Sequence, residues 1–474
     1  MSSMMPDREK VIAGLSALIG ASHVITDDAM MAPYLTDWRK RYTGSALCVV
    51  RPASTDDVIA VMRFAKEHHC AVVPQGGNTG LVGGSVPLGR GDEILLSFQR
   101  MNHIRSLDPD SDTVIVEAGA TLAALQEKAE EVGRLFPLSL ASEGTATVGG
   151  TIATNAGGTA ALVYGTMRDL VLGLEIVLPD GTLLNTLTTL RKDNTGYHLA
   201  SLFMGAEGTL GVITAASLKL FPLPRARSAA FCGLKSPSDA FKLFKHLKHR
   251  AGPSLTTFEL MPRFAIDLAL KHIPGLRDPL SEPHEWYVMP EFSSFVADDA
   301  QEIAATLLEE ALDADIVSDA VISESLAQRE SFWAIRENIP EAQLREGPSI
   351  KHDISVPLAD IPEFIDVVCA ELLITLPGIR PCVFGHVGDG NLHFNLQAPV
   401  GMDEKTYATH AEPIHAIVYR HVGTMKGSVS AEHGIGQVKR SQLAATKDPQ
   451  ALEMMRKIKA VIDPDGGMNP GKIL

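Results

Sequence analysis

The sequence predicts an α+β protein of two or three domains, in which helices and strands alternate along most of the chain. The chain has 474 residues, which is enough for more than one hydrophobic core. Its first half contains predicted strands that lead into glycine-rich segments, and its second half contains strands and helices in regular alternation. From about residue 406 onward the pattern is mostly helical, with a break at the glycines around residues 423–436.

The composition is typical of a globular protein and argues against two functional classes. The formal net charge is −15, whereas a general nucleic-acid binder needs a basic surface. No apolar run approaches the roughly 20 residues of a membrane span. The five cysteines have no Cys-x-x-Cys spacing, which predicts a reducing compartment and no iron–sulfur motif. The apolar run at residues 11–20 follows acidic residues and predicts an amphipathic helix, so we expect a cytoplasmic protein.

Periodicity predicts alternating elements in the first half. Residues 54–70 place apolar side chains on one helical face, and Ser54 can cap that helix. A strand at residues 71–73 leads directly into the glycine-rich segment that begins at Pro74. A second helix is expected at residues 121–133. Further strands are predicted at residues 93–98, 113–117, 171–178 and 210–220.

The proline-flanked stretch Phe221-Pro-Leu-Pro224 predicts a domain boundary. We expect a first domain at residues 1–222 with its core from about residue 42, a second at 223–424, and a C-terminal segment at 425–474. In the second domain, strands are predicted at residues 256–260, 285–291 and 350–356, and helices at 298–312 and 361–376. This alternation favours an antiparallel sheet with helices on one face.

Two histidines flank a turn in the stretch Phe384-Gly-His-Val-Gly-Asp-Gly-Asn-Leu-His-Phe-Asn395. Residues on either side of the central glycines alternate like half-buried strands, which predicts a hairpin. Pairing Val387 with Leu392 would place His386 directly opposite His393, with Cβ atoms about 5 Å apart. Two imidazoles at that spacing can meet at one metal ion. Asn395 would share the face of His393.

An acidic residue and a third histidine follow in the stretch Ser430-Ala-Glu-His-Gly-Ile-Gly436. Two histidines and one carboxylate form a typical catalytic zinc set that leaves one coordination position open. His386, His393 and Glu432 are therefore the candidate metal ligands. The alternative is a hairpin with two surface histidines. The ligand set would also accept Mn²⁺, Co²⁺ or Fe²⁺, so the identity of the metal stays open.

Three glycine-rich blocks lie next to predicted strands, at residues 74–84, 143–158 and 205–211. Glycines allow backbone amides to approach an anion closely and form a nest for a pyrophosphate. The spacing matches neither a Walker loop nor a Rossmann fingerprint. Together the blocks favour one long, phosphate-bearing ligand that lies along the backbone. The alternative is three unrelated tight turns.

These blocks resemble the FAD-binding motifs of the vanillyl-alcohol-oxidase-type flavoproteins, also described as PCMH-type. The matching segments are Gln75-Gly-Gly-Asn-Thr-Gly80, Gly149-Gly-Thr-Ile-Ala-Thr-Asn-Ala-Gly-Gly158 and Gly205-Ala-Glu-Gly-Thr-Leu-Gly211. Three further segments narrow the resemblance to one branch of this family. They are the histidine hairpin, Glu432-His-Gly-Ile-Gly436 and Met468-Asn-Pro-Gly-Lys472. They are similar to the D-2-hydroxyacid dehydrogenase branch, with its D-2-hydroxyglutarate and D-lactate dehydrogenases and the glycolate oxidase D-subunit. The resemblance extends from about residue 40 to the end of the chain.

The resemblance implies an FAD-binding domain of two α/β subdomains, a substrate domain with an antiparallel sheet, and a helical C-terminal return to the flavin. The first glycine loop lacks the histidine that often tethers FAD, so we expect non-covalent FAD. The residues expected at the pyrophosphate are Pro74, Gly76, Gly77, Asn78, Thr79 and Gly80. Those expected along the flavin are Gly144, Thr145, Thr147, Gly150, Thr154, Asn155, Gly158 and Asn469. Those expected nearer the adenosine are Glu207, Gly211 and Ile213.

The resemblance also assigns roles for the oxidation of a 2-hydroxy acid. A metal ion, Zn²⁺ first, would acidify the hydroxyl group, and His433 would act as general base, since neutral imidazole is available near pH 7. The alternative for His433 is a buried structural histidine. Arg336, Lys351 and Asn395 are the candidate substrate-binding residues, and the first two fall on positions that grip carboxylates in the hydroxyglutarate-type members. Some of those members have a threonine where this chain has Pro340, which cannot donate a hydrogen bond.

The favoured function is thus an FAD- and metal-dependent dehydrogenase of D-2-hydroxyglutarate. D-Lactate, D-malate and a glycolate-oxidase-type subunit are alternatives, as is a non-redox transferase like the alkyl-dihydroxyacetone-phosphate synthases of the same superfamily. Since no iron–sulfur motif is present, electrons must pass to another carrier. An electron-transferring flavoprotein, a quinone and a cytochrome are the candidates, and a homodimer is a further possibility.

Overall fold

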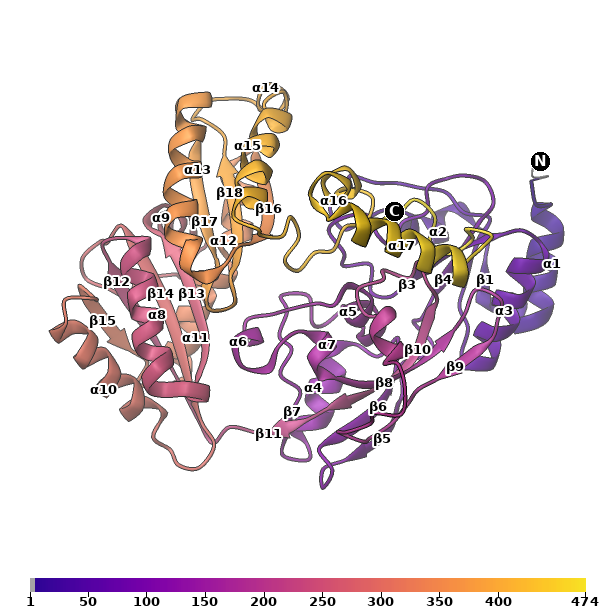
Figure 1. Ribbon diagram of the computed structural model, residues 1–474, viewed down its shortest axis with the longest axis horizontal. Helices are drawn as coiled ribbons and strands as arrows, with labels where there is room; N and C mark the ends of the chain where they lie inside the picture. The colour runs from indigo at the N-terminus through magenta and orange to yellow at the C-terminus, as the bar shows by residue number, and fades with distance from the viewer. Residues whose placement is uncertain (1–4) are drawn as a thin grey trace. The chain divides into compact units, whose positions relative to one another are not determined.

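The computed structural model describes residues 5–474, and the described chain divides into two compact units (Figure 1). The first unit contains the described residues up to Gly158, then Gly165–Pro222 and Glu432–Leu474. The second contains Thr159–Tyr164 and Leu223–Ala431. This division into compact units does not test the domain boundaries expected after residues 222 and 424, which remain predictions. Residues 1–4 of the expected first domain lie outside the described residues.

The first unit contains a mixed sheet and a second, antiparallel sheet. Among the described residues, the mixed sheet has the order β1-β2-β4-β3, with β2, β4 and β3 parallel and β1 antiparallel. Its strands are β1 (Val24–Ile25), β2 (Cys48–Val50), β4 (Glu93–Ser97) and β3 (Ala71–Gln75). The helices of this part are α1 (Arg8–Ile19), α2 (Asp28–Leu35) and α3 (Thr55–Glu67).

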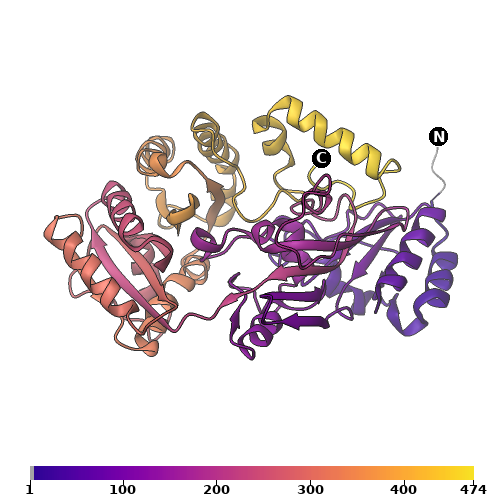
Figure 2. The same cartoon turned by 60° about the horizontal axis from the view of Figure 1, so that its bottom comes forward.

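The second sheet of this unit has the order β5-β6-β10-β8-β9 in the described chain. Its strands are β5 (Ile104–Asp108), β6 (Thr113–Glu117), β10 (Val212–Lys219), β8 (Val171–Val177) and β9 (Leu183–Asn185), and β7 (Arg134–Leu135) pairs separately with β11 (Phe221–Pro222). The remaining helices of the unit are α4 (Leu122–Glu130), α5 (Val148–Thr154), α7 (Met167–Leu170), α16 (Arg440–Thr446) and α17 (Pro449–Ile462). The C-terminal helices lie beside the other elements of this unit in both ribbon views (Figures 1 and 2).

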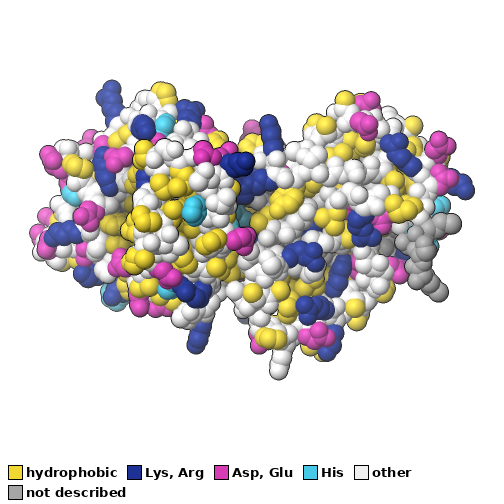
Figure 3. All heavy atoms as spheres, turned by 90° about the horizontal axis from the view of Figure 1, so that it is seen from above, with side chains coloured by type: hydrophobic (Ala, Val, Ile, Leu, Met, Phe, Trp, Pro, Cys, Tyr) yellow, Lys and Arg dark blue, Asp and Glu magenta, His cyan; other side chains and the backbone are white. Residues whose placement is uncertain are grey.

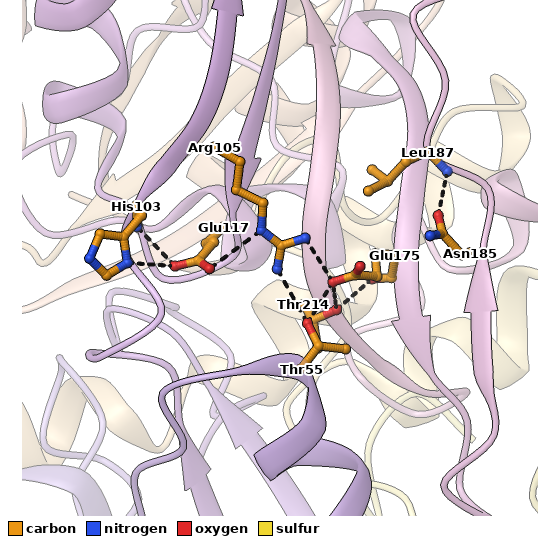
Figure 4. Close-up of polar contacts among 8 residues, drawn as sticks. All are labelled: Thr55, His103, Arg105, Glu117, Glu175, Asn185, Leu187 and Thr214. Atoms are coloured by element: carbon orange, nitrogen blue, oxygen red, sulfur yellow. Dashed lines mark hydrogen bonds and ion pairs between the residues drawn. The ribbon is translucent and has the colours of Figure 1, made fainter.

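A polar network joins the start of α3 to this antiparallel sheet (Figure 4). Arg105 on β5 donates to Glu117 at 3.4 Å, to Glu175 at 3.1 Å and to the Thr55 hydroxyl at 3.2 Å. Glu175 also accepts hydrogen bonds from Thr55 at 2.6 Å and Thr214 at 2.8 Å. Burial opposes ionisation of Glu175, but these hydrogen bonds and the Arg105 charge hold its pKa below the usual range. The network therefore supplies the partners that largely buried carboxylates require.

The second unit is built on one antiparallel sheet, with the order β15-β12-β14-β13-β17-β18-β16 among the residues that the structure describes. Its strands are β15 (Asp319–Ile322), β12 (Ala226–Leu234), β14 (Trp286–Ser294), β13 (Leu255–Pro262), β17 (Arg380–His386), β18 (Asn391–Gln397) and β16 (Ser349–Ser355). Its helices are α6 (Ala161–Tyr164), α8 (Pro237–Ala251), α9 (Arg263–His272), α10 (Ala300–Asp313), α11 (Leu326–Glu337), α12 (Ile339–Glu346), α13 (Ile361–Thr375), α14 (Glu404–Ala408) and α15 (Ala411–Thr424).

Helices cover both faces of this sheet, so the expectation of helices on one face is wrong. Successive residues of β12 show this: Ala230 and Cys232 belong to the core formed with α8, α10, α13 and α15. Ala229 and Phe231 belong to a separate core formed with α9, α11 and α12. A strand that is apolar on both sides must be covered on both sides, because either exposed face would leave a large apolar surface in water.

Most of the predicted elements are present. The helix predicted at residues 54–70 is α3, and the side chain of Ser54 caps it by accepting the Asp57 N–H. The strands predicted at 93–98, 113–117, 171–178 and 210–220 are β4, β6, β8 and β10, and the helix predicted at 121–133 is α4. In the second unit the strands predicted at 256–260, 285–291 and 350–356 are β13, β14 and β16, and the helices predicted at 298–312 and 361–376 are α10 and α13.

One face of the molecule can be compared with the expectation that the protein lacks a basic surface. On the face seen in Figure 3, Lys and Arg side chains are scattered among acidic and apolar ones and do not merge into one basic area. Within residues 5–474, none of the helices combines the length and the apolar composition that crossing a membrane requires. The five cysteines are free thiols.

Replacing Glu175 by Gln should lower the free energy of unfolding at pH 7 by about 1–3 kcal/mol, because Arg105 loses a charged partner. Because the folded-state pKa is lowered, the Glu175 contribution is complete above the ordinary carboxyl pKa and is lost as the pH falls through the folded-state pKa. Urea unfolding of both proteins at pH 7 and at successively lower pH measures this. Glu127→Gln, on the exposed side of α4, is the control. A stability difference that stays constant down to acid pH would contradict the prediction.

Candidate active site

The first and second glycine blocks pack directly against each other in the first unit. A β-carbon at Gly76 would overlap the Thr147 hydroxyl, and one at Gly77 would overlap the Thr145 carbonyl oxygen. These two glycines therefore have a packing reason to lack side chains, beside the expected contact with a pyrophosphate. The sequence indicated a phosphate-binding role for these glycines, but it did not predict this contact between the two loops.

Other positions of the same blocks have space beside them. A β-carbon at Gly80 or Gly144 would have no heavy atom within 4 Å. Asn78, between the packed and the open glycines, has a left-handed backbone with φ of 53°. Its side chain is held by a hydrogen bond to the Thr36 carbonyl at 2.8 Å. A left-handed residue within a glycine-rich turn is a feature of backbone nests for anions, so the loop fits the pyrophosphate of FAD.

The second block forms helix α5 and the turn after it. Thr147 caps α5, because its side chain accepts a hydrogen bond from the Gly150 N–H. Asn155 ends the helix and has a left-handed backbone with φ of 49°. The Asn155 side chain accepts hydrogen bonds from Thr166 at 3.0 Å and the Arg168 N–H at 2.9 Å, while Thr154 donates to the Gly150 carbonyl. These side chains therefore shape the loop that is expected along the flavin.

The third block contains the buried Glu207, whose carboxylate holds the C-terminal segment of the chain. It accepts the N–H groups of Ile435 and Gly436, both at 2.7 Å. Burial raises the pKa of Glu207, and these two hydrogen bonds oppose that effect. The carboxylate is thus directed to the backbone that follows His433. The expected position of Glu207, Gly211 and Ile213 near the adenosine stays a prediction.

Asn469 provides a test of whether the site fits a flavin. Its Nδ2 donates to the carbonyls of Gly84 at 2.9 Å and Glu207 at 2.7 Å, so the amide is held between the first and third blocks. Its Oδ1 is buried and accepts no hydrogen bond from the residues that the structure describes. A buried acceptor of this kind needs a donor, which an N–H of the flavin can supply. The expected approach of Asn469 to the flavin is consistent with this geometry.

In the second unit, the histidine hairpin is present with a different register from the expected one. Strands β17 and β18 pair Phe384 with His393, whereas Val387 belongs to a short 3₁₀ turn. The predicted pairing of Val387 with Leu392 is therefore wrong. His386 and His393 are diagonal rather than direct neighbours, with ring centroids 5.5 Å apart. The two registers differ by two residues, so both histidines stay on the same face.

The predicted metal ligands lie together. Each of His386, His393 and Glu432 has a ligand atom within 4.8 Å of the others, and Glu432 is the first residue after the end of the second unit. A second group with the same spacing contains Asp353, Glu432 and His433. Asp353 was not predicted from the sequence, although it pairs with His393 across β16 and β18. These donors suit a divalent cation.

A buried acidic residue, Glu259 on β13, lies opposite His386 across β13 and β17. It accepts hydrogen bonds from His386 Nδ1 at 2.5 Å and from Arg336 Nε at 2.7 Å. Burial opposes its ionisation, but its contacts with His386 and Arg336 hold its pKa well below the usual range. The sequence signal that could have identified Glu259 is a single charged residue within the strand Leu255–Pro262.

The candidate substrate-binding residues occupy the same face of the sheet. Arg336, from α11, is 7% exposed and its guanidinium carbon lies 4.8 Å from the centre of the Phe384 ring, so it is not a solvated surface charge. Lys351 on β16 pairs with Asn395 on β18, in the row next to Asp353 and His393. Asn395 donates to Gln343 of α12 at 2.9 Å, and Gln343 is another buried residue that sequence reasoning missed.

Comparisons with known proteins identify the family. Residues 46–187 match the model of the FAD binding domain, and residues 223–473 match that of the C-terminal domain of FAD linked oxidases. The chain is 39% identical over 467 residues to D-2-hydroxyglutarate dehydrogenase of Bos taurus, covering 98% of this chain and 84% of the relative. It is 37% identical to the D-2-hydroxyglutarate–pyruvate transhydrogenase of Saccharomyces cerevisiae, covering 94% and 90%.

Solved structures share the fold. p-Cresol methylhydroxylase matches with a TM-score of 0.76 at 16% identity, covering 98% of this chain and 96% of that one. Alkyldihydroxyacetonephosphate synthase matches with a TM-score of 0.72 at 15% identity, covering 99% and 86%. The chain is an FAD-dependent oxidoreductase and belongs to the FAD-linked oxidases, in the branch that contains the D-2-hydroxyglutarate dehydrogenases.

Proposed function

We propose that this protein oxidises a D-2-hydroxy acid, D-2-hydroxyglutarate first, to the 2-oxo acid with non-covalent FAD and a divalent metal ion, Zn²⁺ first. The observation that carries the proposal is the spacing of His386, His393 and Glu432, whose ligand atoms lie within 4.8 Å of one another. The names of relatives from Bos taurus, Arabidopsis thaliana and Danio rerio, which match nearly the whole of this chain, support the choice of substrate. The three glycine-rich blocks would hold FAD, which would supply flavin N5 as the acceptor of the C2 hydride.

The proposed oxidation requires the C2 hydroxyl group to be acidified and then deprotonated, and different residues of the site serve these two steps. His386, His393 and Glu432 would hold a Zn²⁺ ion, which would supply the Lewis acidity that lowers the pKa of the C2 hydroxyl group. His433 takes the hydroxyl proton on an imidazole nitrogen, as a neutral histidine near pH 7 can do. Its place beside Asp353 and Glu432 supports this role.

The distal end of the substrate is the proposed target of Arg336 and Lys351. The Arg336 Nε is committed to Glu259, so a carboxylate would be bound by its two terminal nitrogens. Lys351 offers a point charge on the same face, and Asn395 lies beside it. Pro340 cannot donate a hydrogen bond, which keeps D-lactate and D-malate as alternatives.

The electron acceptor, location and assembly also belong to the proposal. One relative is named a D-2-hydroxyglutarate–pyruvate transhydrogenase, which adds a 2-oxo acid to the candidate acceptors, beside an electron-transferring flavoprotein, a quinone or a cytochrome. The expected cytoplasmic location and homodimer stay predictions, and several relatives are named as mitochondrial. The transferase alternative is supported only by a shared fold at 15% identity.

Anaerobic mixing with D-2-hydroxyglutarate should bleach the flavin absorbance near 450 nm. We expect D-malate, D-lactate and glycolate to act more slowly, because they lack the full-length distal carboxylate arm. EDTA treatment should slow bleaching, and added Zn²⁺ should restore it. Unchanged bleaching after complete metal removal would exclude the metal. No bleaching by any of the four acids would argue for a missing partner subunit or for the non-redox alternative.

His393→Ala should abolish flavin reduction by the substrate while FAD stays bound, because a candidate metal ligand is lost and the residues expected at FAD are unchanged. Stopped-flow absorbance measures the reduction, and the bound flavin spectrum measures FAD content. His249→Ala, at an exposed position on α8, is the matched control and should behave like the unaltered protein. A normal reduction rate in His393→Ala would remove the metal hypothesis.

Lys351→Met should raise the KM for D-2-hydroxyglutarate roughly 10- to 100-fold, the range that loss of a charged hydrogen bond predicts. The KM for D-lactate, which has no second carboxylate, should change by less than about 3-fold. Steady-state kinetics with both acids tests this, and Lys245→Met, an exposed lysine of α8, is the control. Equal losses on both acids would show that Lys351 does not bind the distal carboxylate.

A further inference from the structure

One buried carboxylate contacts both a candidate metal ligand and a candidate substrate-binding residue. Glu259 has an exposed fraction of 0% and pairs with His386 across β13 and β17. Its Oε1 is 2.5 Å from His386 Nδ1, and its Oε2 is 2.7 Å from Arg336 Nε. Glu259 therefore offers a separate oxygen to each partner.

This contact determines which nitrogen of His386 would be left for a metal ion. An ionised carboxylate can only accept hydrogen bonds, so His386 Nδ1 must carry a hydrogen atom. In the neutral ring the lone pair is then on Nε2, the nitrogen left for a ligand bond. Histidine ligands in metal proteins commonly donate their other N–H to a carboxylate, which orients the ring.

The same carboxylate restrains Arg336. The guanidinium is held at Nε by Glu259 and lies over the Phe384 ring, so its plane is set on two sides. Arg336 comes from α11, whereas His386 ends β17. The orientations of His386 and of the Arg336 guanidinium therefore both depend on the Glu259 side chain.

We propose that Glu259 is a positioning residue, which presents His386 Nε2 to the metal ion and sets the orientation of Arg336 for the distal carboxylate. The inference rests on the proposed metal site and deepens it. No contact between Glu259 and substrate is required, since it acts through its two partners.

The competing explanation is that Glu259 only anchors α11 to the sheet. Glu291, on the neighbouring strand β14, provides a matched comparison. It is also buried, and it accepts hydrogen bonds from Arg329 at 2.8 and 3.0 Å and from Trp333 at 2.7 Å, both on α11. Glu291 thus anchors the same helix to the same sheet but is hydrogen-bonded to neither His386 nor Arg336 in the described contacts. A purely structural role would make the two carboxylates equivalent.

The test compares Zn²⁺ affinity in Glu259→Gln and Glu291→Gln. FAD-loaded protein is stripped of metal, and Zn²⁺ binding is measured by competition with a chromophoric chelator, a readout that does not depend on turnover. Gln cannot accept from both His386 and Arg336 without turning its NH₂ group toward one of them. We expect Glu259→Gln to bind Zn²⁺ about 10- to 100-fold more weakly. Glu291→Gln should stay within about 2-fold of the unaltered protein.

The outcomes separate this inference from the proposed function. If the unaltered protein binds no Zn²⁺, the proposed metal site fails and the inference fails with it. If the unaltered protein binds Zn²⁺ and Glu259→Gln binds it equally well, only the inference is overturned. Equal losses in both variants would show that Glu259 acts only as an anchor of α11. Should Glu259→Gln fold poorly, Glu259→Asp keeps the charge and should lose less affinity than Gln but more than the Glu291 control; unchanged affinity would overturn the inference.

Discussion

The hydrogen bonds between the Glu207 carboxylate and the backbone of residues 435–436 determine where the C-terminal segment runs. Both contacts are 2.7 Å long, and the carboxylate that makes them is buried. Gly434 and Gly436 have φ of 80° and 51°, a region that favours glycine, and a β-carbon at Gly434 would lie 2.7 Å from a Glu207 carboxylate oxygen. Because His433 directly precedes this stretch, the third glycine block limits how far the candidate base can move. The third glycine block and the segment that carries the candidate base are therefore held together by these hydrogen bonds.

The second unit uses buried carboxylates in the same way but with side-chain partners. Glu259 and Glu291 lie on neighbouring strands and each receives donors from α11. An unpaired buried carboxylate would cost several kcal/mol, so each one requires its arginine to stay in place. This requirement makes α11 a rigid support rather than an independently mobile helix. The face that carries Arg336 and His386 is thereby ordered before any ligand arrives, which lowers the entropic cost of binding one.

Local patterns predicted the positions that depend on local geometry. Period-two alternation placed His386, His393 and Asn395 on one face, and Ser54 was recognisable as a helix cap. The hairpin register was wrong because Val387, a residue favoured in strands, lies in the turn beside Gly388. Glu259 could not be paired in advance, since it is 127 residues from His386 and 77 from Arg336 in sequence. Strand β12 was missed because Ala-Ala-Phe-Cys is apolar on both faces and lacks alternation.

The loss of a hydroxyl donor at Pro340 weighs less against a dicarboxylate substrate than the presence of Arg336 and Lys351 weighs for it. A hydrogen bond to a charged group contributes about 1.5–3 kcal/mol, and Pro340 removes at most one such bond. Arg336 and Lys351 together could donate several to the distal carboxylate of a dicarboxylic substrate. Arg336 is already buried and oriented by Glu259, so little further ordering is needed when a carboxylate binds it. A monocarboxylate such as D-lactate has no distal carboxylate for Arg336 and Lys351 to bind. The proposed contacts of these two residues therefore favour the longer acid in the proposed reaction.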